Sequence, residues 1–247
     1  MEQTGKFSNG RAALGLLALV ILAAAQLGAQ LLASLPLMVG APVWLGNVLA
    51  GVLYAALDIA QTEPAADLDV VIAACLLHDI GRAEERQDPS VCHAQAGAEK
   101  AYRFLIEVGQ NEPFAAHVRD CIRTHSIGRG ASPESLEAKI LFDADKLDSV
   151  GALGIARTLV FRGERAEPIY TRAPDGSVSD GTGDRQISFF REYKRELERI
   201  YGELYTARGA ALAEARRATA EGFYRALLRE ARETDEKGRA ILRGLLQ

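Results

Sequence analysis

Apolar side chains between residues 70 and 232 recur mainly every three or four positions, a spacing typical of helices with one buried face. No run of alternating apolar and polar residues in the chain predicts a strand. Glycines at 81, 109, 128 and 130 interrupt the pattern and mark helix ends. We therefore predict an all-α fold with helices over residues 70–80, 94–108, 113–125, 135–161, 187–205 and 210–232.

The helical pattern stops at residues 162–184, which are rich in Gly, Pro, Ser and Asp and predict a long surface loop. Apolar residues then return on one face of the predicted helix over residues 187–205, among many Arg and Glu residues. This face indicates packing against the rest of the protein, and a solvated opposite face accounts for the charges without a binding partner.

Residues 12–57 contain no Asp, Glu, Lys or Arg. Within them, residues 12–39 are long and apolar enough to span a bilayer as a helix, since about 20 apolar residues suffice. A signal peptide and a buried helix of a soluble protein remain alternatives. We expect two parts, a hydrophobic N-terminal segment at residues 1–40, which is a candidate membrane helix, and a helical domain at residues 41–247 that includes C-terminal helices over residues 187–232.

Charge and cysteine content narrow the function classes. With 29 Lys and Arg against 33 Asp and Glu, the formal net charge is −4, which argues against a protein that coats nucleic acid. The three cysteines are odd in number and lack C-x-x-C spacing, so a disulfide framework or a zinc knuckle is not predicted. Reduced thiols favour the cytoplasm for the helical domain.

The histidines provide the clearest chemical signal, because all four lie within 48 positions. His78 and Asp79 end a very apolar helix, where burying two ionisable groups is costly unless they pair or bind a metal. His93 opens the next predicted helix and His125 closes the one after it. Imidazole and carboxylate ligands suit Mn, Fe, Zn and similar divalent ions. A core His–Asp pair without a metal remains the alternative for His78 and Asp79.

Three carboxylates, Asp143, Asp145 and Asp148, lie within six positions of an otherwise apolar segment. They repel one another unless a cation offsets them, and Lys146 alone does not offset three. If the segment is one helix, Asp145 and Asp148 share a face, so at most two of the three reach one centre.

Taken in order, the segments LLHDIGR, CHAQAGA, IRTH and LFDADKLDSVGALGIAR resemble the HD superfamily of metal-dependent phosphohydrolases, and the likeness covers about residues 55–232. The resemblance implies a compact HD-domain helical bundle with the metal centre in its middle. It implies that His78, Asp79 and Asp145 bind one metal ion and that His93 and His125 bind a second, with Asp79 able to bridge both. Asp79 and Lys146 are then the expected catalytic residues. Arg82 and Arg123 are weaker candidates for substrate phosphate, and His117 matches no ligand position.

One feature departs from the family. Its motif begins with a further histidine on the first helix of the bundle, but no histidine precedes His78 here, and Asn47 or Val48 stands nearest the expected place. Neither is a good ligand for a transition metal. Either a membrane-like segment replaced the first helix, or the N-terminus of this reading frame is not the original one.

The resemblance implies hydrolysis of a phosphoester, in a nucleotide among other candidates, by a phosphohydrolase or phosphodiesterase that holds one or two divalent ions (Mn, Fe, Zn, Ni or Mg). The first alternative is a degenerate HD domain that binds metal or nucleotide with little or no turnover. A membrane-tethered helical interaction module is the second. We expect a cytoplasmic catalytic domain, with residues 12–39 as the candidate membrane association.

Overall fold

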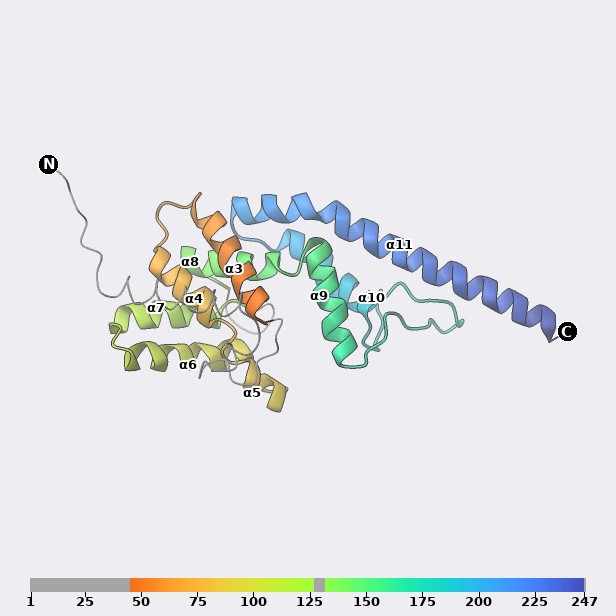
Figure 1. Ribbon diagram of the computed structural model, residues 1–247, viewed down its shortest axis with the longest axis horizontal. Helices are drawn as coiled ribbons and strands as arrows, with labels where there is room; N and C mark the ends of the chain where they lie inside the picture. Colours follow the sequence, from red (N-terminus) through yellow and green to blue (C-terminus); the bar gives the residue numbers. More distant parts are fainter. Residues whose placement is uncertain (1–44, 127–131, 247) are drawn as a thin grey trace. The chain divides into compact units, whose positions relative to one another are not determined.

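The computed structural model describes residues 45–126 and 132–246, with side chains from residue 51 onward (Figure 1). Within those residues every regular element is a helix, and the β-type pairing is limited to an isolated bridge between Arg172 and Val178. The all-α prediction is confirmed. Residues 12–39 and the side chains of Asn47 and Val48 lie outside the described part. No helix of that part is long and apolar enough to cross a membrane.

The helices, in chain order, are α3 (Leu45–Ala60), α4 (Leu68–Leu77), α5 (Arg82–Gln87), α6 (His93–Glu107), α7 (Glu112–Arg123), α8 (Leu136–Leu147), α9 (Gly151–Glu164), α10 (Phe189–Glu192), the π-helix η1 (Tyr193–Leu197), the 3₁₀-helix η2 (Ile200–Gly202) and α11 (Ala207–Leu245). Most of the helices follow one another with short connections, and a long loop over residues 165–188 separates α9 from α10.

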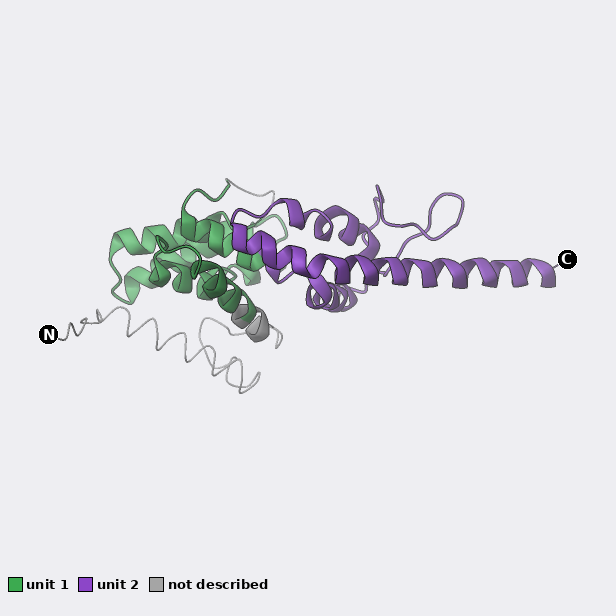
Figure 2. Cartoon of the chain, turned by 90° about the horizontal axis from the view of Figure 1, so that it is seen from above, with its two compact units in different colours: residues 1–145 green, residues 146–247 purple. Residues whose placement is uncertain are grey.

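The chain divides after Asp145 into two compact units (Figure 2). In the first unit α4 is the central helix, because seven of its ten residues are buried and it packs against both α3 and α7. The Asp67 carboxylate caps its start by accepting from the backbone N–H groups of Asp69 and Val70. Helices α6 and α7 pack side by side along the same unit (Figure 1). The buried end of α4 is therefore surrounded by other helix ends.

The prediction of one helix over residues 135–161 is wrong. The segment forms α8 and α9, which are separated at residues 148–150. Gly151 begins α9 with a φ of 73°, a left-handed conformation that residues with a β-carbon rarely adopt. A β-carbon on Gly154 would also lie 2.2 Å from the carbonyl carbon of Ser149, so the backbone turns back tightly here. The apolar periodicity of the sequence continues across this turn, because residues on both sides of the turn are buried.

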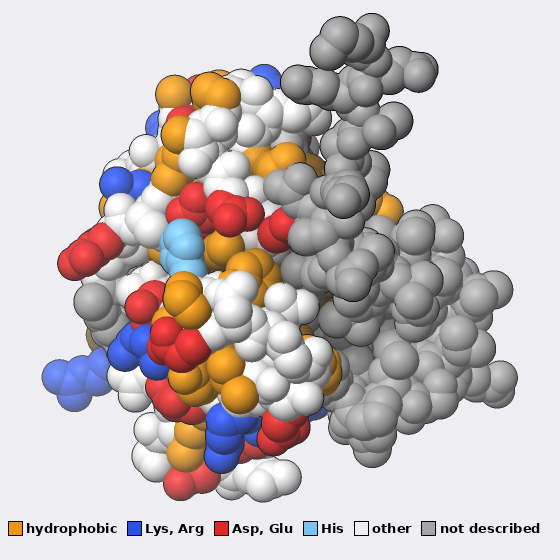
Figure 3. Space-filling model, turned by 90° about the vertical axis from the view of Figure 1, so that its left-hand side faces the viewer, with side chains coloured by type: hydrophobic (Ala, Val, Ile, Leu, Met, Phe, Trp, Pro, Cys, Tyr) orange, Lys and Arg blue, Asp and Glu red, His pale blue; other side chains and the backbone are white. Residues whose placement is uncertain are grey.

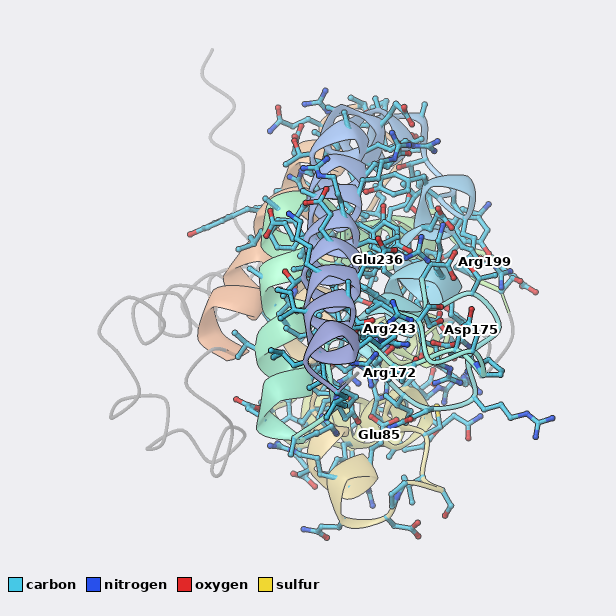
Figure 4. All side chains as sticks on the ribbon, turned by 90° about the vertical axis from the view of Figure 1, so that its right-hand side faces the viewer. Glu85, Arg172, Asp175, Arg199, Glu236 and Arg243 are labelled. Carbon is cyan, nitrogen blue, oxygen red and sulfur yellow. The ribbon has the colours of Figure 1, made fainter. Side chains whose placement is uncertain are left out.

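The second unit contains the remaining helices. The predicted helix over residues 187–205 is instead three short pieces, α10, η1 and η2, and the last helix is longer than expected at 39 residues. Tyr193 of η1 stacks on Tyr224 of α11 with ring centroids 4.1 Å apart. The loop before α10 is tied to α11 by ion pairing of Arg172 with Asp235. Figure 4 labels Arg172 and Asp175 in this loop and Glu236 and Arg243 on α11.

Candidate metal centre

Four helix ends supply the predicted ligands of the first unit. His78 and Asp79 follow α4 directly, His93 is the first residue of α6, and His125 lies two residues beyond the end of α7. Asp145 lies in the last turn of α8. The expectation that His93 opens a helix and that His125 closes one is confirmed. His78 and His125 have no solvent exposure, and His93 is nearly buried.

The side chains of these residues converge on the carboxylate of Asp79. Its Oδ1 lies 3.8 Å from Nε2 of His93 and 3.7 Å from Nε2 of His125, and its Oδ2 lies 3.6 Å from Nε2 of His78. Nε2 of His78 is also 3.8 Å from Oδ1 of Asp145. One ligand atom each from Asp79, His93 and His125 fit within 4.8 Å of one another. These separations are too long for hydrogen bonds and leave room between the ligand atoms.

Hydrogen bonds on the other ring nitrogen orient the histidines. Nδ1 of His78 lies 2.7 Å from the carbonyl oxygen of Cys75, and Nδ1 of His125 lies 2.6 Å from that of Ile122. A carbonyl oxygen only accepts, so both Nδ1 atoms carry the proton and both Nε2 atoms present a lone pair. These two Nε2 atoms are buried and have no hydrogen-bond partner. A buried imidazole nitrogen that lacks a partner and faces a carboxylate fits a metal ion.

Burial keeps two of these imidazoles neutral. It lowers the pKa of His78, and the negative charges of Asp79 and Asp145 offset this only in part. Burial and the nearby Arg82 guanidinium lower the pKa of His93 to about 4. A neutral imidazole is the form that binds metal, so both rings are ready to act as ligands at neutral pH.

Arg82 contacts two carboxylates of the site. Its Nε donates to Oδ1 of Asp79 at 2.8 Å, and its Nη1 donates to Oε2 of Glu85 at 3.1 Å. Burial opposes ionisation of Asp79, yet the Arg82 guanidinium, which donates to Oδ1, holds the pKa of this carboxyl below its usual range. Asp79 is therefore an anion in the middle of the histidines, with a positive charge against one of its oxygens.

Other residues singled out in the sequence have different surroundings. Lys146 directly follows Asp145 in α8 and is largely buried. Asp148 lies beyond the end of α8, so it does not share a helix face with Asp145 as expected, and it pairs with Arg157 of α9. Arg123 pairs with Asp120 at the exposed end of α7. Asp143 is fully buried.

His117, which matches no ligand position of the family, contacts a different set of residues. Its Nε2 lies 3.1 Å from Oε2 of Glu137 and 3.2 Å from Oγ of Ser135. The other carboxylate oxygen of Glu137 accepts from the backbone N–H of Asp67, the residue that caps α4. Figure 3 shows a face of the molecule on which a histidine lies beside several Asp and Glu side chains. The contacts of His117 join α7 to the starts of α4 and α8.

Glu85 also contacts the site, although no sequence pattern singles it out, and its Oε2 lies 3.0 Å from Nδ1 of His93. The sequence does not distinguish Glu85 from Glu84, because both are acidic residues in the short charged helix RAEERQ. The backbone carbonyls behind His78 and His125 were not predicted either. Both histidines end helices, where the last carbonyls lack helical partners, and this signal was present in the sequence.

Comparison with known proteins identifies this arrangement. The model of the HD-domain family matches residues 49–150, the stretch that contains all five converging side chains. A predicted HD-superfamily hydrolase from an uncultured Thermotogales bacterium is 30% identical, and the match covers 74% of this chain and 79% of that one with a TM-score of 0.50. The chain belongs to the HD-domain family.

Two further relatives define how far the likeness extends. YpgQ of Bacillus subtilis is 29% identical over 155 residues, which are 61% of this HD-domain chain and 67% of YpgQ. Its crystal structure aligns with a TM-score of 0.58 over 75% of this chain and 87% of that one, and YpgQ has also been crystallised in complex with ADP. An HD-superfamily hydrolase from Bacillus thuringiensis, at 21% identity, shares the fold over 90% of this chain and 98% of its own with a TM-score of 0.63.

Proposed function

We propose that this HD-domain protein is a divalent-metal-dependent phosphohydrolase that cleaves a phosphoester of a nucleotide. The observation that carries the proposal is the pair of buried Nε2 atoms on His78 and His125, which lack hydrogen-bond partners and face the Asp79 carboxylate. Leaving two such groups unsatisfied in the interior costs about 1–3 kcal/mol each. A metal ion would remove that cost.

The two oxygens of Asp79 face different ligands, which supports a site for two ions. Oδ2 faces His78, which in turn lies close to Asp145. Oδ1 faces His93 and His125. In our proposal His78, Asp79 and Asp145 would hold one ion, His93 and His125 would hold another, and Asp79 would contact both.

A bound divalent ion supplies two things to this reaction, since it lowers the pKa of a coordinated water and polarises the phosphoryl group. Side chains of the protein supply the other parts of the proposed site. Asp79 keeps its negative charge and anchors the centre, while the buried histidines exclude bulk water from it. In our proposal Lys146 offsets charge that develops on the phosphoryl oxygens. Arg82, at the edge of the centre with 40% of its side chain exposed, would assist in binding the substrate phosphate.

A nucleotide is the proposed substrate class because YpgQ, a relative of 26–27% identity and the same fold, forms a complex with ADP. The three cysteines, all of them free thiols, support a catalytic domain that works in the reducing cytoplasm. We propose hydrolysis of a phosphomonoester or of a phosphodiester, because the same metal ligands serve both reactions.

A second candidate function is a degenerate HD domain that binds metal or nucleotide with little turnover. The observation in its favour is that no histidine precedes His78 anywhere in the sequence, so one ligand of the family pattern is missing. With fewer ligands the affinity for a metal falls, and a coordinated water is less well oriented.

One experiment separates the two candidates. The purified chain is incubated with Mn²⁺ and a panel of nucleoside mono-, di- and triphosphates and aryl phosphodiesters, and phosphate or nucleoside release is measured beside Asp79→Asn. Turnover in the wild type that needs Mn²⁺ and disappears in Asp79→Asn supports the hydrolase. Mn²⁺ binding without turnover on any substrate, together with turnover after a histidine is introduced at Asn47 or Val48, would support the degenerate domain.

A further inference from the structure

Glu85, which is labelled in Figure 4, lies on the short helix α5 and contacts both the Arg82 guanidinium and the His93 ring. Its Oε2 lies 3.0 Å from Nδ1 of His93 and 3.1 Å from Nη1 of Arg82. The same Nη1 is 3.4 Å from Nδ1 of His93, so these three groups form a small triangle behind the metal-facing side of the ring. One oxygen of Glu85 therefore has two nitrogen neighbours.

The two neighbours of His93 Nδ1 favour opposite tautomers of its ring. Glu85 accepts a hydrogen bond, which places the proton on Nδ1 and leaves a lone pair on Nε2. Arg82 only donates, which would leave Nδ1 without a proton and put the proton on Nε2. Nε2 is the atom that lies 3.8 Å from Oδ1 of Asp79. A proton on it would stop His93 from binding a metal ion.

We propose that Glu85 is a positioning residue that fixes His93 in the tautomer with the proton on Nδ1, so that Nε2 is available to a metal ion. This inference rests on the proposed metal-dependent function. Glu85 occupies both donors at once, because the oxygen that accepts from His93 also accepts from Arg82. Once Nδ1 donates its proton to Glu85, it has no lone pair left to accept a hydrogen bond from the guanidinium.

Three features of the surroundings support this role. The His93 ring is nearly buried, so water does not replace a lost acceptor easily. The same Glu85 oxygen pairs with the Arg82 guanidinium at 3.1 Å, and a positive charge this close favours the carboxylate form, which only accepts hydrogen bonds. His78 and His125 use backbone carbonyls for the same purpose, whereas His93, at a helix start, has the Glu85 carboxylate beside its Nδ1.

Replacing Glu85 tests the inference without any metal present. In the metal-free full-length protein, long-range ¹H–¹⁵N NMR of the histidine rings reports which nitrogen carries the proton. We expect the proton on Nδ1 of His93 in the wild type and on Nε2 in Glu85→Ala. Glu85→Gln should resemble the wild type, because its amide oxygen still faces the same two donors. If Glu85→Ala keeps the wild-type tautomer, Glu85 does not select it.

A Co²⁺ titration of the same variants, followed by the visible absorption of the ion, measures how the change of tautomer affects metal affinity. Loss of a group that orients a ligand typically weakens metal binding about 10–100-fold, and we expect this for Glu85→Ala and a smaller loss for Glu85→Gln. The matched control is Glu84→Ala, since Glu84 is the preceding residue of α5 but pairs with Lys100 instead. It should bind Co²⁺ like the wild type.

The outcomes distinguish this inference from the proposed function. A wild type that binds no Co²⁺ would contradict the metal centre and the role of Glu85 together. A wild type that binds Co²⁺, with the same dissociation constant in Glu85→Ala, would contradict the role of Glu85 alone. If Glu85→Ala folds poorly by circular dichroism, Glu85→Met keeps the length of the side chain without a strong acceptor. It should show the same shift of tautomer and affinity.

Discussion

His78 and His125 are oriented in the same way, each by a carbonyl oxygen three residues earlier in the chain. Those carbonyls belong to the last turns of α4 and α7. Each histidine thus satisfies a helix end and turns its Nε2 towards Asp79. The sequence predicts these residues as ligands from the ordered series LLHDIGR, CHAQAGA, IRTH and LFDADKLDSVGALGIAR, not from the His-Asp pair alone. It does not predict that Glu85 rather than Glu84 supports His93, since that depends on which way α5 turns.

His117 provides a matched control for the histidines of the centre. We expect His125→Ala to weaken Mn²⁺ binding about 10–100-fold or more. Loss of a group that only orients a ligand typically weakens metal binding by this factor, and loss of the ligand itself should weaken it at least as much. His117→Ala should leave Mn²⁺ affinity unchanged, because this ring contacts Glu137 and Ser135 instead. Isothermal titration calorimetry with Mn²⁺ measures both. Equal effects of the two substitutions would show that His125 acts through stability alone.

The position of α6 relative to the end of α4 depends on the close approach of Gly81 and Gly97. A β-carbon on Gly81 would lie 2.2 Å from the carbonyl oxygen of His93 and 2.6 Å from the backbone nitrogen of Gly97. The backbone after Asp79 therefore touches the first turns of α6, and this contact sets the distance between Asp79 and His93. Sequence patterns identified Gly81 as a helix end, but they did not reveal this contact, which joins positions sixteen residues apart.

Gly81→Ala should therefore separate α6 from the end of α4. We expect a loss of about 1–3 kcal/mol in the free energy of unfolding, because the clash is with backbone that has no room to relax. Metal affinity should fall as well, since His93 moves with α6. Gly222→Ala is the control, because a β-carbon at this α11 position meets nothing within 4 Å and alanine favours helix. Urea unfolding and Co²⁺ titration of both variants test this, and a Gly81→Ala protein as stable as the wild type would contradict it.

Glu137 joins the starts of two helices and makes stability depend on pH. Burial raises its pKa, but the Asp67 backbone N–H and the nearby His117 outweigh this effect, so the pKa of Glu137 is lower than in the unfolded chain. Its contribution to stability is therefore full above the unfolded value of about 4.3 and is lost as the pH falls through the folded value.

We expect Glu137→Gln to lower the free energy of unfolding at pH 7 by about 1–3 kcal/mol, as for a hydrogen bond to a charged group. The difference from the wild type should shrink as the pH falls below about 4.3, where the wild-type carboxylate becomes protonated. Urea unfolding at pH 7, 5 and 3.5 measures this. A difference that stays constant over the whole range would show that the charge of Glu137 contributes nothing.

At the scale of the whole molecule, the ordered motifs from LLHDIGR to LFDADKLD are enough to predict the helical fold and the family. They are less informative about helix boundaries beyond residue 135, because apolar periodicity does not distinguish one long helix from two that turn at Gly151. The long α11 was predicted too short for a similar reason, since its last turns carry exposed rather than buried apolar residues.

Among the described residues, the converging side chains lie between positions 78 and 145, and residues 1–40 contain no His, Cys or Asp, so we expect no ligand from them. We expect a chain that begins at residue 41 to bind Mn²⁺ with the affinity of the full-length protein and to keep its Mn²⁺-dependent turnover. Calorimetry and phosphate release on both proteins measure this, with circular dichroism as the check that the shorter chain is folded. A folded shorter chain with weaker binding would show that the N-terminal segment completes the site.

The most direct test of the metal centre is the anomalous difference density of a crystal grown with Mn²⁺. The account predicts one or two strong peaks beside the Asp79 carboxylate, each within about 2.0–2.3 Å of a carboxylate oxygen or of an Nε2 atom of His78, His93 or His125. Peaks elsewhere only, or no peak beside Asp79 at saturating Mn²⁺, would contradict it.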